Sequence, residues 1–147
     1  MIPLYDDNPT RSTPVLTVLL IAACVAVFAW QAGLGEQAAN AAIYRFGLVP
    51  ALLLDGARLP ASLAPLPPVL TVFSAMFMHG SWMHLIGNML YLWIFGNNVE
   101  DELGSSRFVF FYAACGLVAA LAHALQAPGS TVPMVGASGA IAGVLGA

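Results

Sequence analysis

Charged residues are scarce in this sequence, and lysine is absent. Only 7% of the 147 residues are charged, whereas soluble domains usually carry about 25%. Hydrophobic residues make up 60% of the chain, and the mean hydropathy is +0.86. The few arginines form no basic patch, which argues against a nucleic-acid-binding protein. We therefore expect an all-α membrane protein of several spans, with the lipid bilayer as its surroundings.

Cysteine is almost as rare, with one residue at position 24 and one at position 115. Each lies inside an apolar run, and their spacing matches no metal-binding pattern. We interpret Cys24 and Cys115 as buried, unreactive packing residues. The sequence predicts neither a bound metal nor a cofactor.

Three apolar stretches are candidates for membrane-spanning helices. Residues 14–32 carry no charge and would form about 28 Å of helix. Residues 82–99 and 107–125 are the second and third candidates, and a fourth opens at 135–147 but covers only about 20 Å. We expect three transmembrane helices and part of a fourth, and we read the chain as a piece of a longer protein. A cleaved signal peptide is the alternative for the first stretch, but it is long for that role and further spans follow.

The remaining residues divide into a tail and a long mixed segment. Residues 1–13 form a polar tail, and residues 14–147 form the transmembrane domain. Residues 33–81 contain five prolines, which exclude a spanning helix from the proline-rich part. Within them we predict an interfacial helix at 44–54. The apolar stretch 69–78 is too short to span and is predicted to be interfacial or re-entrant.

A break at residues 79–81 separates that short piece from the second span. Ser81 is suited to cap a helix that begins at Trp82. The alternative is one continuous span over residues 69–95.

One hydroxyl stands among small residues where the last apolar stretch begins, in the sequence Gly136-Ala137-Ser138-Gly139. Small residues allow another element to approach the backbone closely. The simplest interpretation is a helix-packing seam, because Gly139 and Gly143 are four residues apart. A motif of this kind is weak by itself.

A second polar group favours a functional site. His84 and Asn88 lie four residues apart, hence on one helical face, and His79 lies just before their helix. Counting the spans places these residues and Ser138 near the same membrane surface. Polar side chains at that depth are costly unless they face the bundle interior or a water-filled cavity. Polar contacts between helices remain an alternative, and a zinc site matches the histidine spacing poorly.

Nucleophilic hydrolysis fits this set of side chains. A serine hydroxyl needs a base to take its proton, and the oxyanion that forms needs preorganised donors. The N–H of Ser138, at a helix start, has no partner within the helix and is available as one donor. On composition alone His79 and His84 are both candidate bases. We interpret His123, near the end of the third span, as an interfacial or packing residue.

Two stretches resemble the rhomboid family of intramembrane serine proteases. The sequence from His79 to Asn88 is similar to that family's second-helix motif, and residues 136–139 resemble its G-x-S-G nucleophile motif. The acidic stretch 98–101, followed by Gly104 and Arg107, is also similar. The resemblance covers the chain from about Phe46 onward.

The resemblance implies a rhomboid-like polytopic helical bundle and a mechanism without a cofactor. Ser138 would be the nucleophile, and its N–H would bind the oxyanion together with His84 and Asn88. The substrate would be a transmembrane segment of another membrane protein, cut near the outer surface. The residues that would support this site are His79, Gly136 and Gly139.

The chain departs from the family pattern in two places. The family's general base is a histidine on the sixth helix, which lies beyond this chain, so we expect little proteolysis by these residues alone. Some members carry a Trp-Arg pair where residues 69–72 read Val-Leu-Thr-Val. The alternative function is a non-enzymatic membrane protein that binds other transmembrane helices.

The arginines indicate an orientation. Arg11 and Arg107 lie close to span ends on one side, while Arg45 and Arg58 lie in the long segment on the other. The closer pair favours a cytoplasmic N-terminus. The short loops lead us to expect a prokaryotic plasma membrane.

Overall fold

The computed structural model describes residues 11–60, 63 and 66–147, and this part of the chain is built from helices. Its β-structure is limited to one isolated bridge between Leu48 and Met134. The prediction of an all-α membrane bundle is therefore confirmed. The helices are α1 (Val15–Ala32), α2 (Glu36–Phe46), α3 (Pro50–Leu54), α4 (Pro68–Ser74), α5 (Trp82–Leu103), α6 (Ser105–Gln126) and α7 (Ser138–Leu145).

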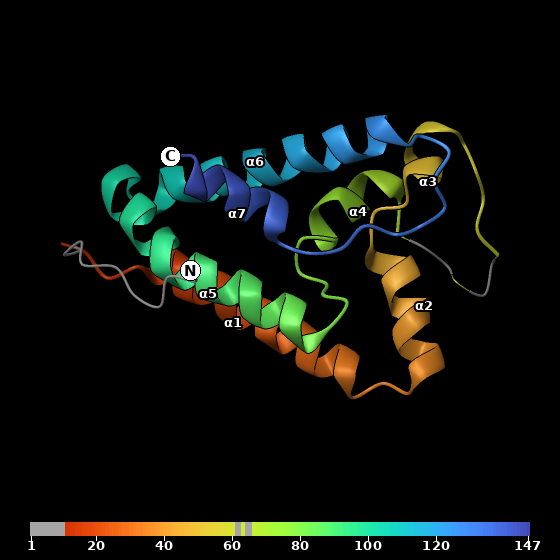
Figure 1. The fold of residues 1–147 in the computed structure, drawn as a ribbon, viewed down its shortest axis with the longest axis horizontal. Helices are drawn as coiled ribbons and strands as arrows, with labels where there is room; N and C mark the ends of the chain where they lie inside the picture. Colours follow the sequence, from red (N-terminus) through yellow and green to blue (C-terminus); the bar gives the residue numbers. More distant parts are fainter. Residues whose placement is uncertain (1–10, 61–62, 64–65) are drawn as a thin grey trace.

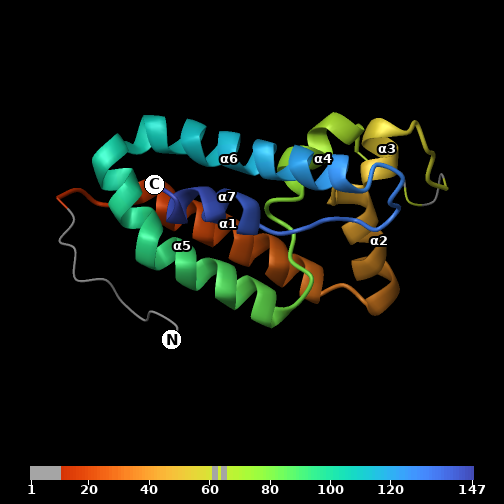
Figure 2. The same cartoon turned by 45° about the horizontal axis from the view of Figure 1, so that its top comes forward.

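The long helices form the body of the molecule. Helices α1 and α5 lie side by side, and α7 lies between α5 and α6 (Figures 1 and 2). The short helices α2, α3 and α4 gather at one end, where α6 also ends (Figure 1). The main apolar core lies where α1, α5, α6 and α7 meet.

Two of the described helices, α1 and α6, are long and apolar enough to cross a membrane. Helix α5 is as long as α6, with 22 residues in each. Histidine and asparagine side chains along α5 make it more polar, and Asn88 among them is buried inside the molecule. The predicted second span therefore stays an interpretation that rests on length and on the packing of α5 against α1.

The predicted interfacial helix at 44–54 is wrong. Two helices share this region, α2 and α3, because residues 47–49 leave the helical conformation between them. Leu48 exchanges backbone hydrogen bonds with Met134, at 3.0 Å and 2.7 Å. Pro50 then begins α3, where its missing N–H costs nothing.

The break before the second span is confirmed. Helix α4 ends at Ser74, and turns follow before α5 begins at Trp82. The Ser81 hydroxyl accepts a hydrogen bond from the N–H of His84 at 3.2 Å, as an N-cap does. The alternative of one continuous span over residues 69–95 is wrong.

Helix α5 runs four residues past its predicted end at position 99 and stops at Gly104, whose φ of 75° lies in the left-handed region. The acidic residues continue the helix because Glu100 is buried and hydrogen-bonded. Its carboxylate accepts from the backbone N–H groups of Leu16 (2.9 Å) and Thr17 (2.8 Å), and from the Thr17 hydroxyl (2.8 Å). Glu100 thus caps the first turn of α1 from a neighbouring helix.

The neighbouring carboxylate, Asp101, holds the chain that leads into α1. It accepts from the N–H groups of Arg11 at 2.9 Å and Ser12 at 2.7 Å. Residues 11–13 of the predicted tail are exposed, yet they are tied to the end of α5. The rest of that tail, residues 1–10, lies outside the described residues.

The two cysteines differ in burial. Cys24 is 1% exposed in the main core, as predicted. Cys115 is only half-buried, so the prediction of a buried residue is wrong at this position. It packs against Gly143 of α7, and the small residues around this contact leave an open cavity beside it.

Candidate active site

Ser138 is the first residue of α7 and follows an irregular segment. We predicted this helix from residue 135, which is wrong because backbone contacts hold the preceding residues elsewhere. Met134 pairs with Leu48, and the N–H of Gly136 donates to the carbonyl of Ala75 at 2.8 Å. The hydroxyl is therefore presented at a helix start, where backbone N–H groups have no partner within the helix.

Two side chains of α5, His84 and Asn88, approach the segment before Ser138 at Gly136. A Cβ at Gly136 would lie 2.6 Å from Cε1 and Nε2 of His84 and 3.6 Å from Nδ2 of Asn88. The φ of Gly136 is 120°, which L side chains rarely adopt. Both α5 side chains therefore approach the backbone two residues before Ser138, at a position that only glycine suits.

Asn88 brings an unused donor to this point. Its side chain is 8% exposed, and its amide nitrogen has no hydrogen-bond partner among the described residues. A buried N–H left unpaired is costly, so such groups call for an explanation such as a ligand or a water.

Ser138 itself opens onto a cavity of about 200 Å³ between α6 and α7. His123 of α6 lines the same cavity, although the sequence suggested only an interfacial or packing role for it. Gly139 also lines the cavity and packs on Ala119, where a Cβ would lie 2.5 Å from the Ala119 Cβ. The small-residue face of α7 is therefore a packing seam as well as one wall of the cavity.

His79 lies next to His84, in the loop between α4 and α5, and is fully buried. Its ring centroid is 5.2 Å from that of His84, in an edge-on arrangement. Burial lowers the pKa of His79 to about 4, with a further contribution from His84. Its Nδ1 lies 3.2 Å from the Phe77 carbonyl, and its Nε2 has no partner among the described residues. We interpret this buried, neutral imidazole as a packing partner that holds the His84 ring in place.

Two residues of α1 that sequence reasoning missed hold His79 in place. The amide of Gln31 is buried and donates to the His79 carbonyl at 2.7 Å. The Phe28 ring lies edge-on to His79 and to Trp82, with centroids 6.5 Å and 4.9 Å apart. A polar residue in the last turn of an apolar span was the available signal for Gln31, because such a group requires a partner.

The arrangement contains several of the groups that acyl transfer needs. It combines an accessible hydroxyl, an unpaired buried amide, an imidazole and a free helix start within one region. In the part of the chain that the structure describes, no three histidine, cysteine or carboxylate groups come together as a metal site would need.

Comparisons with known proteins point the same way. A model of the rhomboid domain matches residues 67–147. The chain is similar to the mitochondrial presenilin-associated rhomboid-like protein of Mus musculus, with 34% identity over 119 residues, 77% of this chain and 31% of that protein. It is 40% identical over 76 residues to rhomboid protease GluP of Bacillus subtilis, covering 52% of this chain and 14% of that protein. RHOMBOID-like protein 5 of Arabidopsis thaliana is 37% identical over 76 residues, 52% of this chain and 25% of that protein.

These relatives are longer than the part that matches, and they come from different kinds of organism. The chain spans only 14% to 31% of the length of the relatives named. They come from a bacterium, a plant and a mammalian mitochondrion, so the expectation of a prokaryotic plasma membrane is not supported.

Proposed function

Because the chain belongs to the rhomboid family, we propose that it carries the nucleophile and the oxyanion-binding groups of an intramembrane serine protease. One observation carries the proposal. The His84 ring and the Asn88 amide meet the backbone at Gly136, two residues before the Ser138 hydroxyl at the start of α7. These residue types supply what a serine hydrolase needs apart from its base.

In the proposed reaction the Ser138 hydroxyl attacks a peptide carbonyl, and a base takes the hydroxyl proton. The new C–O bond gives a tetrahedral intermediate, whose negative oxygen accepts hydrogen bonds from the Asn88 amide, His84 and the N–H of Ser138. The C–N bond then breaks, the amine leaves with the proton, and an acyl-enzyme remains. Water repeats the sequence and releases the acid.

Neither His79 nor His84 is a good general base for Ser138. His79 is buried and its pKa is about 4, so at neutral pH it is a weak proton acceptor. His84 lies against Gly136 on the oxyanion side. We propose that the base is a histidine on a later helix, as the resemblance to the family implies, and that residues 1–147 alone cleave little.

The protein is an integral membrane protein, since it belongs to this family and has apolar helices long enough to span. We propose a cytoplasmic N-terminus, which sets Ser138 near the outer surface. The substrates would be transmembrane segments of other proteins, because a site of this kind is reached from within the membrane.

The test is cleavage by the full-length protein in liposomes, with a fluorescent transmembrane substrate. We expect cleavage that Ser138→Ala abolishes and His123→Ala retains. Cleavage that survives in Ser138→Ala would overturn the proposal. Loss of cleavage in His123→Ala with normal folding would instead assign the base to the cavity wall on α6.

The second candidate is a non-enzymatic protein that binds other transmembrane helices, and a small-residue seam such as that of α7 is a usual surface for helix packing. In the structure α6 packs on that seam through Ala119 and Cys115. The seam therefore has a partner within the molecule, which favours the enzymatic proposal.

A further inference from the structure

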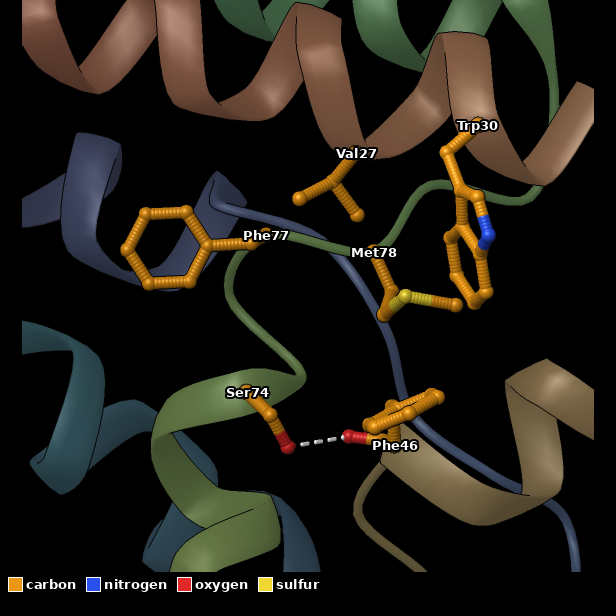
Figure 3. A pocket seen from close by; sticks show the side chains of 6 residues that line it. All are labelled: Val27, Trp30, Phe46, Ser74, Phe77 and Met78. Carbon is orange, nitrogen blue, oxygen red and sulfur yellow. Dashed lines mark hydrogen bonds between the residues drawn. The ribbon is translucent and has the colours of Figure 1, made fainter.

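An apolar groove that does not include Ser138 lies between the end of α1, the end of α2 and α4 (Figure 3). Its volume of about 310 Å³ is at the lower end of the range for small-molecule sites. The Ser74 hydroxyl on its wall donates to the Phe46 carbonyl at 2.6 Å, so this hydroxyl proton is already used. The groove is lined by Val27, Trp30, Phe46, Ser74, Phe77 and Met78.

The shape of the groove suits a flexible hydrocarbon chain. The Trp30 and Phe46 rings meet edge-on with centroids 5.9 Å apart, and the Met78 side chain lies between Val27 and Phe46 (Figure 3). Trp30 is 48% exposed at the end of a membrane-spanning helix, a usual place for tryptophan at the membrane interface. We therefore expect the groove to open toward lipid, at the level where headgroups meet acyl chains.

A cation lies at the edge of this groove. Arg45, in the last turn of α2, is exposed, and its guanidinium carbon lies 5.9 Å from the centroid of the Phe46 ring. No carboxylate lies within ion-pair distance of it among the residues that the structure describes. An exposed arginine beside an apolar groove is suited to bind a phosphate, to which it can donate two hydrogen bonds.

We propose that this groove binds one anionic phospholipid, with an acyl chain along Trp30, Phe46 and Met78 and the phosphate on Arg45. Charge complementarity decides the occupant. An apolar side chain of another protein would leave Arg45 unpaired, and a free phosphate would leave the groove unfilled. Ser138 does not line this groove, so lipid binding here can be tested whether or not the protein is a protease.

The test measures lipid retention by the full-length protein with native mass spectrometry in detergent. The lipids added are dioleoyl phosphatidylglycerol and, for comparison, dioleoyl phosphatidylcholine. We expect Arg45→Gln to lower retention of phosphatidylglycerol about fivefold and to leave phosphatidylcholine unchanged. Val27→Trp, which fills the groove, should lower retention of both lipids.

The matched control is Arg58→Gln, which removes an exposed arginine from the same inter-helix segment. Equal losses in Arg45→Gln and Arg58→Gln would overturn the proposal, since overall charge would then explain binding. Unchanged retention in Val27→Trp would overturn it too.

A measurement on the unaltered protein covers the case in which a variant fails to fold. Phosphatidylglycerol with a diazirine on its acyl chain should cross-link chiefly to Val27, Trp30 and Met78, as mapped by peptide mass spectrometry. Labelling spread evenly over other exposed apolar residues, such as Phe110 and Val118 of α6, would contradict the proposal.

Discussion

The imidazole of His84 rests on the backbone of Gly136, in the space that a Cβ would occupy at this position. Any other residue here would meet the ring at 2.6 Å and would need a φ of 120°. We predict that Gly136→Ala lowers proteolysis by the full-length protein at least 100-fold, because His84 and the Ser138 segment must move apart. The strained backbone should cost about 2 kcal/mol of unfolding free energy.

The control for this variant is Gly129→Ala, in the same loop. A Cβ at Gly129 would have no heavy atom within 4 Å. Activity should stay within about twofold, and equal losses in the two variants would refute the role given to the His84 contact.

Asn88 offers a separate test of oxyanion binding. Its amide nitrogen has no partner among the described residues, so its removal breaks no hydrogen bond seen in this structure. Asn88→Ala should lower kcat about 100- to 1,000-fold with little change in KM. Asn40→Ala, on the exposed face of α2, is the matched control and should be neutral. A drop confined to KM would show that Asn88 contributes to substrate binding instead.

Glu100 should contribute chiefly to stability. Its carboxylate accepts hydrogen bonds from Leu16, from Thr17 and from the Ser105 hydroxyl at 2.6 Å. Glu100→Ala leaves these donors unpaired and should lower the free energy of unfolding by about 2 to 4 kcal/mol.

Glu102→Ala is the control, because Glu102 is exposed on the same helix and should matter by less than about 0.5 kcal/mol. Both values come from unfolding of the full-length protein in mixed micelles. Similar values for the two variants would mean that capping of α1 contributes little.

His79 predicts a pH dependence. Burial holds its pKa at about 4, below the ordinary 6.5, so the unfolded chain binds a proton at a higher pH than the folded protein does. Stability is therefore complete above about pH 6.5 and falls as the pH drops toward 4. His79→Gln should flatten this fall in the thermal unfolding midpoint, while His123→Gln, at an exposed position, should not. An unchanged pH profile in His79→Gln would assign the acid sensitivity to other groups.

The sequence predicted well whatever depends on local composition. The apolar run of α1 and the Ser81 cap each follow from a few adjacent residues. The helix count also predicted His84 and Ser138 at one surface, and in the structure the His84 ring contacts Gly136, two residues before Ser138.

Features that depend on distant contacts were missed. The split between α2 and α3 follows from pairing of Leu48 with Met134, which are far apart in the chain. The extension of α5 follows from hydrogen bonds between Glu100 and α1. Gln31 escaped notice because its side-chain amide donates to the His79 carbonyl, which lies in the distant loop before α5. Helix propensity and hydrophobic periodicity are local properties, so they do not reveal contacts between residues that are distant in the chain.

Covalent labelling of Ser138 tests the central claim most directly. The full-length protein in detergent is treated with a fluorophosphonate probe, and the adduct is located by peptide mass spectrometry. We predict an adduct on Ser138 that is lost in Ser138→Ala and strongly reduced in Asn88→Ala. A folded protein that takes up no label at Ser138, or takes it up elsewhere, would contradict the assignment of this hydroxyl as the nucleophile.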